Sequence, residues 1–186
     1  MPRTLEELRE ECQSCRRCGL CEERTNVVFG SGNPNAKIMF IGEAPGERED
    51  LSGVPFVGRA GQLLDKFLEA IDLEREDVYI ANMCKCRPPK NRDPKPEEQD
   101  MCIEYLREQV KIIRPALIVC LGRISAQRLI SPDFKVTREH GTVFEKGGFK
   151  IMGTFHPAAL LRNPNQKPEA FEDFQVIKMF AQELLK

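Results

Sequence analysis

The chain has 186 residues, of which 41% are hydrophobic and 31% are charged, and its formal net charge is −1 at pH 7. This length and composition predict a soluble globular protein with a single domain over residues 1–186. No apolar run is long enough to cross a membrane, so we expect no membrane partner, and there is no global positive charge to attract nucleic acid.

The opening segment, residues 1–11, is polar and charged and lacks the apolar stretch of a secretory signal peptide. We therefore expect a cytoplasmic protein, in which disulfide bonds are rare and clustered cysteines favour metal binding. Residues 5–12 are predicted to form a short amphipathic helix that leads into such a cluster.

Eight cysteines are present, and four of them fall at every third position from Cys12 to Cys21. Inert buried thiols would account for Cys120, which stands in an apolar run, but not for a cluster among charged residues. Four thiolates suit either tetrahedral zinc or an iron–sulfur cluster. The ferredoxin pattern ends in a longer spacing followed by proline, whereas Glu22 follows Cys21 here, so the run is not typical of a ferredoxin.

The rest of the chain alternates between apolar strands and amphipathic helices. Strands are predicted at 37–42, 78–82, 116–121 and 149–155, and helices at 60–71, 96–113, 122–129 and 169–185. Apolar strands separated by helices imply a parallel sheet that is covered on both faces. We therefore predict a three-layer α/β fold with a four-stranded parallel sheet flanked by helices.

Chemically suggestive residues follow three of these strands. The segment 43–46 (EAPG) follows the first, Asn82 ends the second, and His156 follows the fourth. Each has an ordinary structural explanation as a turn, a cap or a structural histidine. Because ligands of such sheets bind outside the carboxyl ends of the strands, the convergence of all three favours a functional site.

Several longer motifs in the same order carry a resemblance to a known family. They are 24–30 (RTNVVFG), 42–46 (GEAPG), 55–61 (PFVGRAG), 85–89 (KCRPP) and 156–164 (HPAALLRNP). With them the chain resembles the iron–sulfur uracil-DNA glycosylases, usually called family 4, from Cys15 to about Pro164. The resemblance implies a uracil-DNA glycosylase-like fold and a [4Fe-4S] cluster. It also implies an enzyme that hydrolyses the N-glycosidic bond of uracil in DNA and so initiates base excision repair.

The resemblance also implies a ligand set for the cluster. It selects Cys15, Cys18, Cys86 and Cys102 as ligands and leaves Cys12, Cys21 and Cys84 as additional cysteines. Zinc in the same site is the alternative that spacing leaves open. In either case the metal would be chiefly structural and would fasten the basic loop after the second strand.

The roles that the resemblance implies for the uracil site begin with binding of a flipped-out base. Phe56 would stack on the base and Asn82 would pair with its polar edge, next to Ala44. His156 would donate a hydrogen bond to O2 of the leaving uracil. Phe56 could instead be a core residue, and His156 a cap.

The attacking water and the exclusion of thymine are less well defined. Related glycosylases carry an aspartate where Ala44 stands and a tyrosine where Gly46 stands, so neither function is assigned by the motif. Glu43 and Glu49 are the nearest carboxylates, and we expect them to position the water.

The DNA-binding residues that we predict surround these segments. Phosphate contacts are assigned to Arg59, Lys85, Arg87 and Arg162, and the apolar wedge that fills the vacated stack to Leu160 or its neighbour Leu161. One of these two leucines would then belong to the core. The expected partner is uracil-containing DNA, single- or double-stranded, bound by a monomer.

Two other functions remain compatible with the sequence. The chain could be a catalytically inactive DNA-binding module, or an iron–sulfur electron carrier. Release of free uracil from a uracil-containing oligonucleotide separates the enzyme from both.

Overall fold

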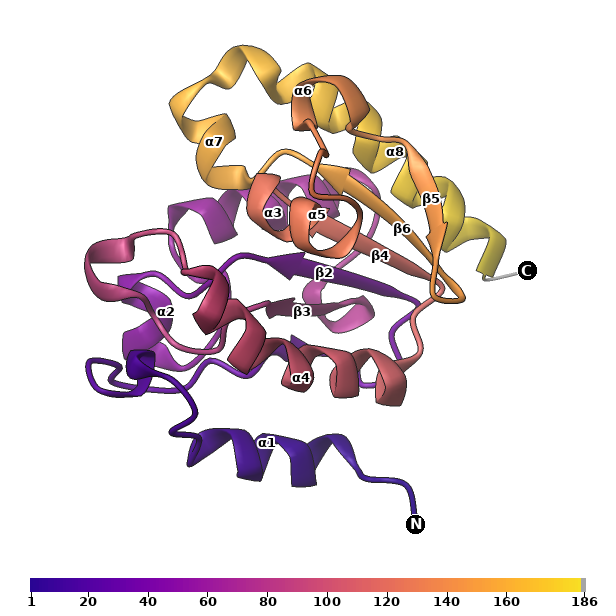
Figure 1. Ribbon diagram of the computed structural model, residues 1–186. Helices are drawn as coiled ribbons and strands as arrows, with labels where there is room; N and C mark the ends of the chain where they lie inside the picture. The colour runs from indigo at the N-terminus through magenta and orange to yellow at the C-terminus, as the bar shows by residue number, and fades with distance from the viewer. Residues whose placement is uncertain (185–186) are drawn as a thin grey trace.

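Six strands form one mixed sheet in the computed structural model, which describes residues 1–184 (Figure 1). The order is β1-β3-β2-β4-β6-β5, and the four central strands run parallel. These central strands are β3 (Tyr79–Asn82), β2 (Ile38–Gly42), β4 (Leu117–Leu121) and β6 (Phe149–Thr154). They are the four predicted strands, so the predicted parallel sheet is confirmed as the centre of a larger one.

Two antiparallel edge strands correct the predicted count of four. The strand β1 (Ser31–Gly32) pairs with β3, and β5 (Val143–Lys146) pairs with β6 through a turn at Gly147 and Gly148, both of which have positive φ. The strand β1 is too short to show a hydrophobic period, and β5 ends in two exposed charged residues. Neither therefore carried the apolar pattern by which the other strands were recognised.

Helices cover both faces of this sheet. Their bounds are α1 (Leu5–Gln13), α2 (Glu47–Ser52), α3 (Arg59–Ala70), α4 (Pro96–Ile113), α5 (Arg123–Leu129), α6 (Val136–Glu139), α7 (Pro157–Arg162) and α8 (Lys167–Leu184). The five predicted helices are confirmed within two residues at each described end, and the predicted end of the last, Leu185, lies outside the described residues. The short helices α2, α6 and α7 were not predicted.

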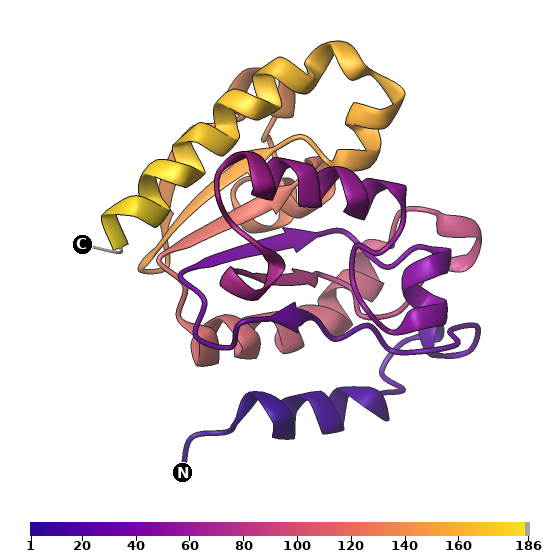
Figure 2. The same ribbon diagram turned by 180° about the vertical axis from the view of Figure 1, so that it is seen from behind.

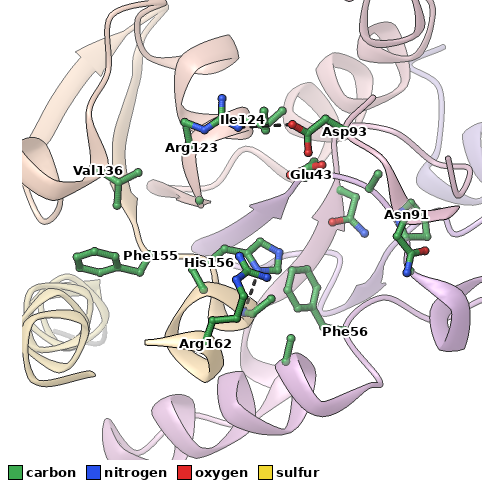
Figure 3. A pocket seen from close by; sticks show the side chains of 18 of the residues that line it. Glu43, Phe56, Asn91, Asp93, Arg123, Ile124, Val136, Phe155, His156 and Arg162 are labelled. Atoms are coloured by element: carbon green, nitrogen blue, oxygen red, sulfur yellow. Dashed lines mark hydrogen bonds and ion pairs between the residues drawn. The ribbon is translucent and has the colours of Figure 1, made fainter. Parts of the chain in front are cut away.

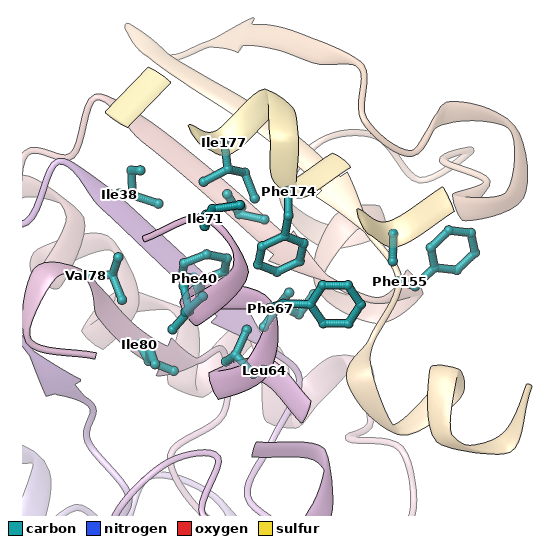
Figure 4. Packing of buried hydrophobic residues seen from close by; sticks show 14 of the residues in the cluster. Ile38, Phe40, Leu64, Phe67, Ile71, Val78, Ile80, Phe155, Phe174 and Ile177 are labelled. Carbon is teal, nitrogen blue, oxygen red and sulfur yellow. The ribbon is translucent and has the colours of Figure 1, made fainter. Parts of the chain in front are cut away.

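Successive strand residues point to opposite faces, which gives the three layers (Figures 1 and 2). Ile38 and Phe40 pack against α3 and α8, whereas Met39 and Ile41 pack under α4 and α5. On the first face the ring of Phe174 lies 4.8 Å from that of Phe67 and 5.9 Å from that of Phe40 (Figure 4). Burial of each such ring stabilises the fold by up to about 3 kcal/mol.

A third, smaller cluster attaches the N-terminal segment to the body. The helix α1, which begins at a capping box between Thr4 and Glu7, packs against α4 and buries Leu8. Leu20, Phe29 and Tyr105 complete this cluster, together with several cysteines. The cysteine-bearing segment is thus held beside α4, outside the three layers.

The order of the parallel strands reverses between β2 and β4, because the chain passes from β2 to β3 on one side and returns to β4 on the other. In sheets of this kind the crevice at such a reversal is the usual ligand site. Within residues 1–184, none of the helices is both long enough and apolar enough to cross a bilayer.

Candidate active site

A cavity of about 600 Å³ opens at the carboxyl ends of the parallel strands (Figure 3). It is lined by seven of the residues that the sequence singled out: Glu43, Ala44, Glu49, Phe56, Asn82, His156 and Arg162. They come from the end of β3 and from segments that follow β2 and β6, which are far apart in the sequence. The predicted convergence at this edge of the sheet is therefore confirmed, whereas the roles of the individual residues remain predictions.

Phe56 forms one wall of the cavity. Its side chain is 4% exposed, and its ring centroid lies 5.6 Å from that of His156 with the planes tilted by 31°. Gly42, at the end of β2, leaves room for this ring, because a Cβ there would lie 2.7 Å from Cζ of Phe56 and would also meet Oδ1 of Asn82. Gly42, the first glycine of the GEAPG motif, thus allows the ring of Phe56 and the amide of Asn82 to lie together at the end of β2.

Asn82 is the last residue of β3 and is 2% exposed. Its backbone carbonyl accepts a hydrogen bond from Nζ of Lys85 at 2.7 Å. Among the described residues, none makes a hydrogen bond with its side-chain amide. The amide therefore has both a donor and an acceptor for a ligand in the cavity.

His156 is the N-cap residue of α7, and its Nδ1 accepts a hydrogen bond from the backbone N–H of Ala158 at 3.0 Å. Burial, with a smaller contribution from the positive charge of Arg162, lowers the pKa of His156 to about 4. The ring is therefore neutral at pH 7. Because Nδ1 is an acceptor, the hydrogen of the neutral ring is on Nε2.

Glu43 lies beside a carboxylate that the sequence did not single out, Asp93 (Figure 3). Burial, the negative charge of Asp93 and a hydrogen bond with Asp93 together raise the pKa of Glu43 to about 7, whereas Arg123 opposes the shift. Arg123 forms an ion pair with Asp93 at 3.5 Å. Glu43 thus changes its ionisation state near neutral pH. Glu49, on α2, lines the same cavity.

A second, much smaller cavity lies beside α4 and is lined by six cysteines: Cys12, Cys15, Cys18, Cys21, Cys86 and Cys102. The four predicted ligands are among them, but Cys12 and Cys21, set aside by the resemblance, share the cavity, so position alone does not select the four. As the side chains stand, no three or more His, Cys, Asp or Glu residues within residues 1–184 are already grouped around a position for a metal ion, so the metal assignment rests on the chemistry of the donors.

Hydrogen-bond donors point at the sulfur atoms of this region. Nη1 of Arg24 donates to Sγ of Cys86 at 3.3 Å, and the backbone N–H of Lys85 donates to Sγ of Cys102 at 3.2 Å. A hydrogen bond from Cys84 is the main reason why the pKa of Cys102 is lowered to about 7. Buried thiolates need such donors, so the residues present suit thiolate ligands of a metal or an iron–sulfur cluster.

Lys85 was predicted to contact DNA phosphate, and this prediction is wrong. Its side chain is 1% exposed, and its Nζ donates to the carbonyl of Asn82 and to Oε1 of Gln109, each at 2.7 Å. The ammonium group is therefore enclosed between β3 and α4. Of the other predicted contacts, Arg59 and Arg162 are exposed, and Arg87 is half-buried.

Leu160 was predicted as a candidate wedge, and this prediction is also wrong. The residue is 1% exposed and belongs to the core between the sheet, α3 and α8. Leu161 is half-buried and packs against the same core, and it stays the remaining candidate. The sequence could not separate the two because the helix α7, which turns one leucine inward, was not recognised.

The comparisons with known proteins point in one direction. The family model described as the uracil DNA glycosylase superfamily matches residues 29–176. A type-4 uracil-DNA glycosylase of Archaeoglobus fulgidus is 48% identical over 182 residues, which cover 94% of this chain and 92% of the relative. The type-4 enzyme of Thermotoga maritima is 44% identical over 95% of this chain and 94% of its own length. A type-5 enzyme of Pyrobaculum aerophilum is 33% identical over 69% of this chain and 64% of its own length.

Proposed function

The chain belongs to the type-4 uracil-DNA glycosylases and removes uracil from DNA, and we propose that it does so in the cavity at the strand ends. The resemblance predicted from the motifs is thereby confirmed. The observation that carries the proposed site is the hydrogen bond that fixes the tautomer of His156. It leaves one N–H, on Nε2, for a ligand in the cavity.

In the proposed reaction the uracil nucleotide leaves the base stack, and its base enters the cavity. The uracil ring stacks on Phe56, which is buried and packed beside His156. The amide of Asn82 pairs with the polar edge of uracil, donating to O4 and accepting from N3–H. Ala44 lines the same cavity and, having a small side chain, leaves room for the base.

His156 acts as the glycosidic bond breaks. Negative charge then develops on the leaving base, and an N–H donor aimed at O2 stabilises that charge more than it stabilises the bound substrate. A neutral imidazole suits this role, and the pKa of about 4 keeps it neutral. A single donor of this kind contributes on the order of 3 kcal/mol to stabilisation of the transition state.

Glu43 and Glu49 are proposed to position the attacking water. The cationic sugar that forms needs little activation of its nucleophile, so orientation of water by a carboxylate is sufficient. The ionised form of Glu43 accepts a hydrogen bond from water, whereas the neutral form competes as a donor. The pKa of about 7 therefore makes this contribution depend on pH.

The cysteine-lined region is proposed to hold a [4Fe-4S] cluster on Cys15, Cys18, Cys86 and Cys102, with zinc as the alternative. When bound, such a group supplies metal–sulfur bonds that join the N-terminal segment to α4 and to the chain after β3. The N–H donors of Arg24 and Lys85 support this assignment, because they stabilise sulfur that carries negative charge. The reaction takes place in the other cavity.

DNA is proposed to bind across the mouth of the larger cavity. Arg59, Arg87 and Arg162 contact phosphates, and Leu161 approaches the gap that the uracil leaves. We expect a monomer that accepts single- and double-stranded DNA, which sedimentation and binding to both substrates will test.

The decisive experiment measures release of free uracil from a uracil-containing oligonucleotide by the protein and by His156→Asn. Asparagine is a good helix N-cap, so α7 is retained while the imidazole N–H is lost. We expect release by the parent protein and a loss of about 100-fold in the variant. Equal rates would refute the role of His156. An inactive DNA-binding module or an electron carrier would release no uracil in either case.

A further inference from the structure

The turn that carries Phe56 has a backbone conformation that residues with a side chain rarely adopt. The φ angle of Phe56 is +53°, in the left-handed region, and the residue is neither glycine nor asparagine. Such a conformation persists only where the surrounding structure holds it, and it is frequent at ligand sites.

One side chain from outside the cavity holds this turn. Arg75, in the short 3-10 turn Arg75–Asp77 that follows α3, donates from Nη1 to the carbonyl of Pro55 at 3.0 Å. Its Nη2 donates to the carbonyl of Phe56 itself, and the same Nη2 also donates to the carbonyl oxygen of Gly61 at 3.4 Å. Its Nε forms an ion pair with Asp65 at 2.5 Å.

These contacts join both sides of the turn through one planar group. A guanidinium can bridge several carbonyls in a fixed geometry, whereas an ammonium cannot do so in the same way. Gly61 adds a steric restraint, because a Cβ there would collide with the backbone of Phe56. The turn is therefore confined by α3 on one side and by Arg75 on the other.

We propose that Arg75 is a positioning residue of the glycosylase, which holds the backbone of Phe56 so that its ring is ready to stack on the flipped-out uracil. The inference rests on the proposed stacking role of Phe56. Arg75 does not line the cavity, so its effect on uracil release passes through Phe56. Substrate binding then does not have to order the turn, which is the advantage of a preorganised site.

A double-mutant cycle on the single-turnover rate of uracil release tests the proposal, with Arg75→Ala, Phe56→Ala and the combined variant. Loss of base–aromatic stacking lowers the rate in Phe56→Ala on the order of 10- to 100-fold. We expect the rate in Arg75→Ala to fall by most of the factor seen in Phe56→Ala. The combined variant should release uracil no more slowly than Phe56→Ala alone. Circular dichroism fixes a temperature at which all variants are folded.

Two further variants serve as matched controls. Asp65→Asn removes the ion pair of Arg75 but leaves its bonds to the carbonyls, and we expect most of the activity to remain. Arg75→Lys keeps the charge without the planar fork, and we expect it to resemble Arg75→Ala. Because lysine preserves charge and much of the packing, this variant carries the test if Arg75→Ala does not fold.

The outcomes separate this inference from the proposed function. If the losses of Arg75→Ala and Phe56→Ala multiply in the combined variant, Arg75 acts independently and the inference is wrong. If Phe56→Ala is impaired while Arg75→Ala and Arg75→Lys are as fast as the parent, the inference fails and the stacking role stands. If Phe56→Ala is as fast as the parent, the stacking role itself fails.

Discussion

The cavity at the strand ends and the cysteine-lined region beside α4 give their buried ionisable groups different hydrogen-bond partners. In the cavity, burial favours neutral side chains, with the pKa of His156 near 4 and that of Glu43 near 7. In the cysteine-lined region burial also raises the pKa of Cys86, to about 11, but the guanidinium of Arg24 opposes that rise. Hydrogen bonds from Cys84 and from the backbone N–H of Lys85 help to lower the pKa of Cys102. One region is suited to a charge that forms only during a reaction, the other to a charge that is permanent.

The two regions meet in the short stretch between Asn82 and Cys86. Lys85 donates through its side chain to the carbonyl of Asn82 and through its backbone to Cys102. A substitution that displaces the backbone of this stretch should therefore affect both regions. A substitution that changes only the chemistry of one side chain should affect its own region alone. Substitutions in each region test this division.

The largest effect is expected from Cys86→Ser, which removes a proposed cluster ligand. We expect loss of bound iron and a large fall in thermal stability, because a metal-bound site contributes its binding free energy to folding. Iron content and thermal unfolding followed by circular dichroism provide the measurement.

Cys21→Ser is the matched control for this experiment, because Cys21 lines the same cavity but is not a proposed ligand. It should retain iron. Full iron content and an unchanged melting temperature in Cys86→Ser would remove Cys86 from the ligand set, and loss of iron in Cys21→Ser would extend the set.

The second largest effect is expected from His156→Ala, about 100-fold in single-turnover uracil release, with iron content unchanged. Stability should fall only by about 1 kcal/mol, the usual cost of losing an N-cap side chain. His140→Ala should show the opposite pattern. His140 bonds Asp173 at 2.9 Å, away from the cavity lining, so its loss should affect stability more than rate.

The pH dependence of uracil release gives a third, smaller effect. Glu43 is neutral below its pKa of about 7, so the rate should rise with pH through that value as its carboxylate forms. Asp93→Asn removes a negative charge that raises this pKa and should move the rise to lower pH. Arg123→Gln removes a charge that lowers it and should move the rise to higher pH.

Glu43→Gln is the control for this third experiment and should abolish the rise of the rate with pH, here called the pH step. Shifts of Asp93→Asn and Arg123→Gln in the same direction would show that the pH step does not belong to Glu43. A pH step that survives in Glu43→Gln would assign it to another group.

The smallest effect is expected from Arg162→Gln. Loss of one phosphate contact should weaken binding to uracil-containing and undamaged DNA alike, and should reduce the slope of log K against log [salt] by about one. Arg107→Gln is the control, because Arg107 is exposed on α4 and does not line the cavity. If the slope of log K against log [salt] is the same in Arg162→Gln and Arg107→Gln, Arg162 does not contact a DNA phosphate.

Much of the fold was predictable because its elements bury continuous apolar patterns. The central strands have every residue buried except at the start of β6, and α4 begins at a proline with acidic neighbours, both of which are local signals. The edge strands have no such pattern. The convergence of Asn82 and His156 was predictable because the ends of parallel strands meet at one edge.

The residues that were missed depend on contacts between distant segments. Asp93 lies within a proline-rich loop, and only folding brings it to Glu43, some fifty positions earlier in the sequence. The burial of Lys85 depends on Gln109, which faces it from α4. In the sequence, a lysine beside arginine and proline is typical of a phosphate contact, and no local pattern indicates that it is enclosed.

The cap on α7 has a consequence for the recognition of uracil-containing DNA. Arg162 is the last residue of this helix, and His156 is fastened to its first turn through the N–H of Ala158. The proposed phosphate contact of Arg162 and the proposed hydrogen bond of His156 to the leaving base therefore lie at opposite ends of one six-residue helix. We therefore expect a DNA strand whose phosphate misses Arg162 to present its uracil less well to the N–H of His156.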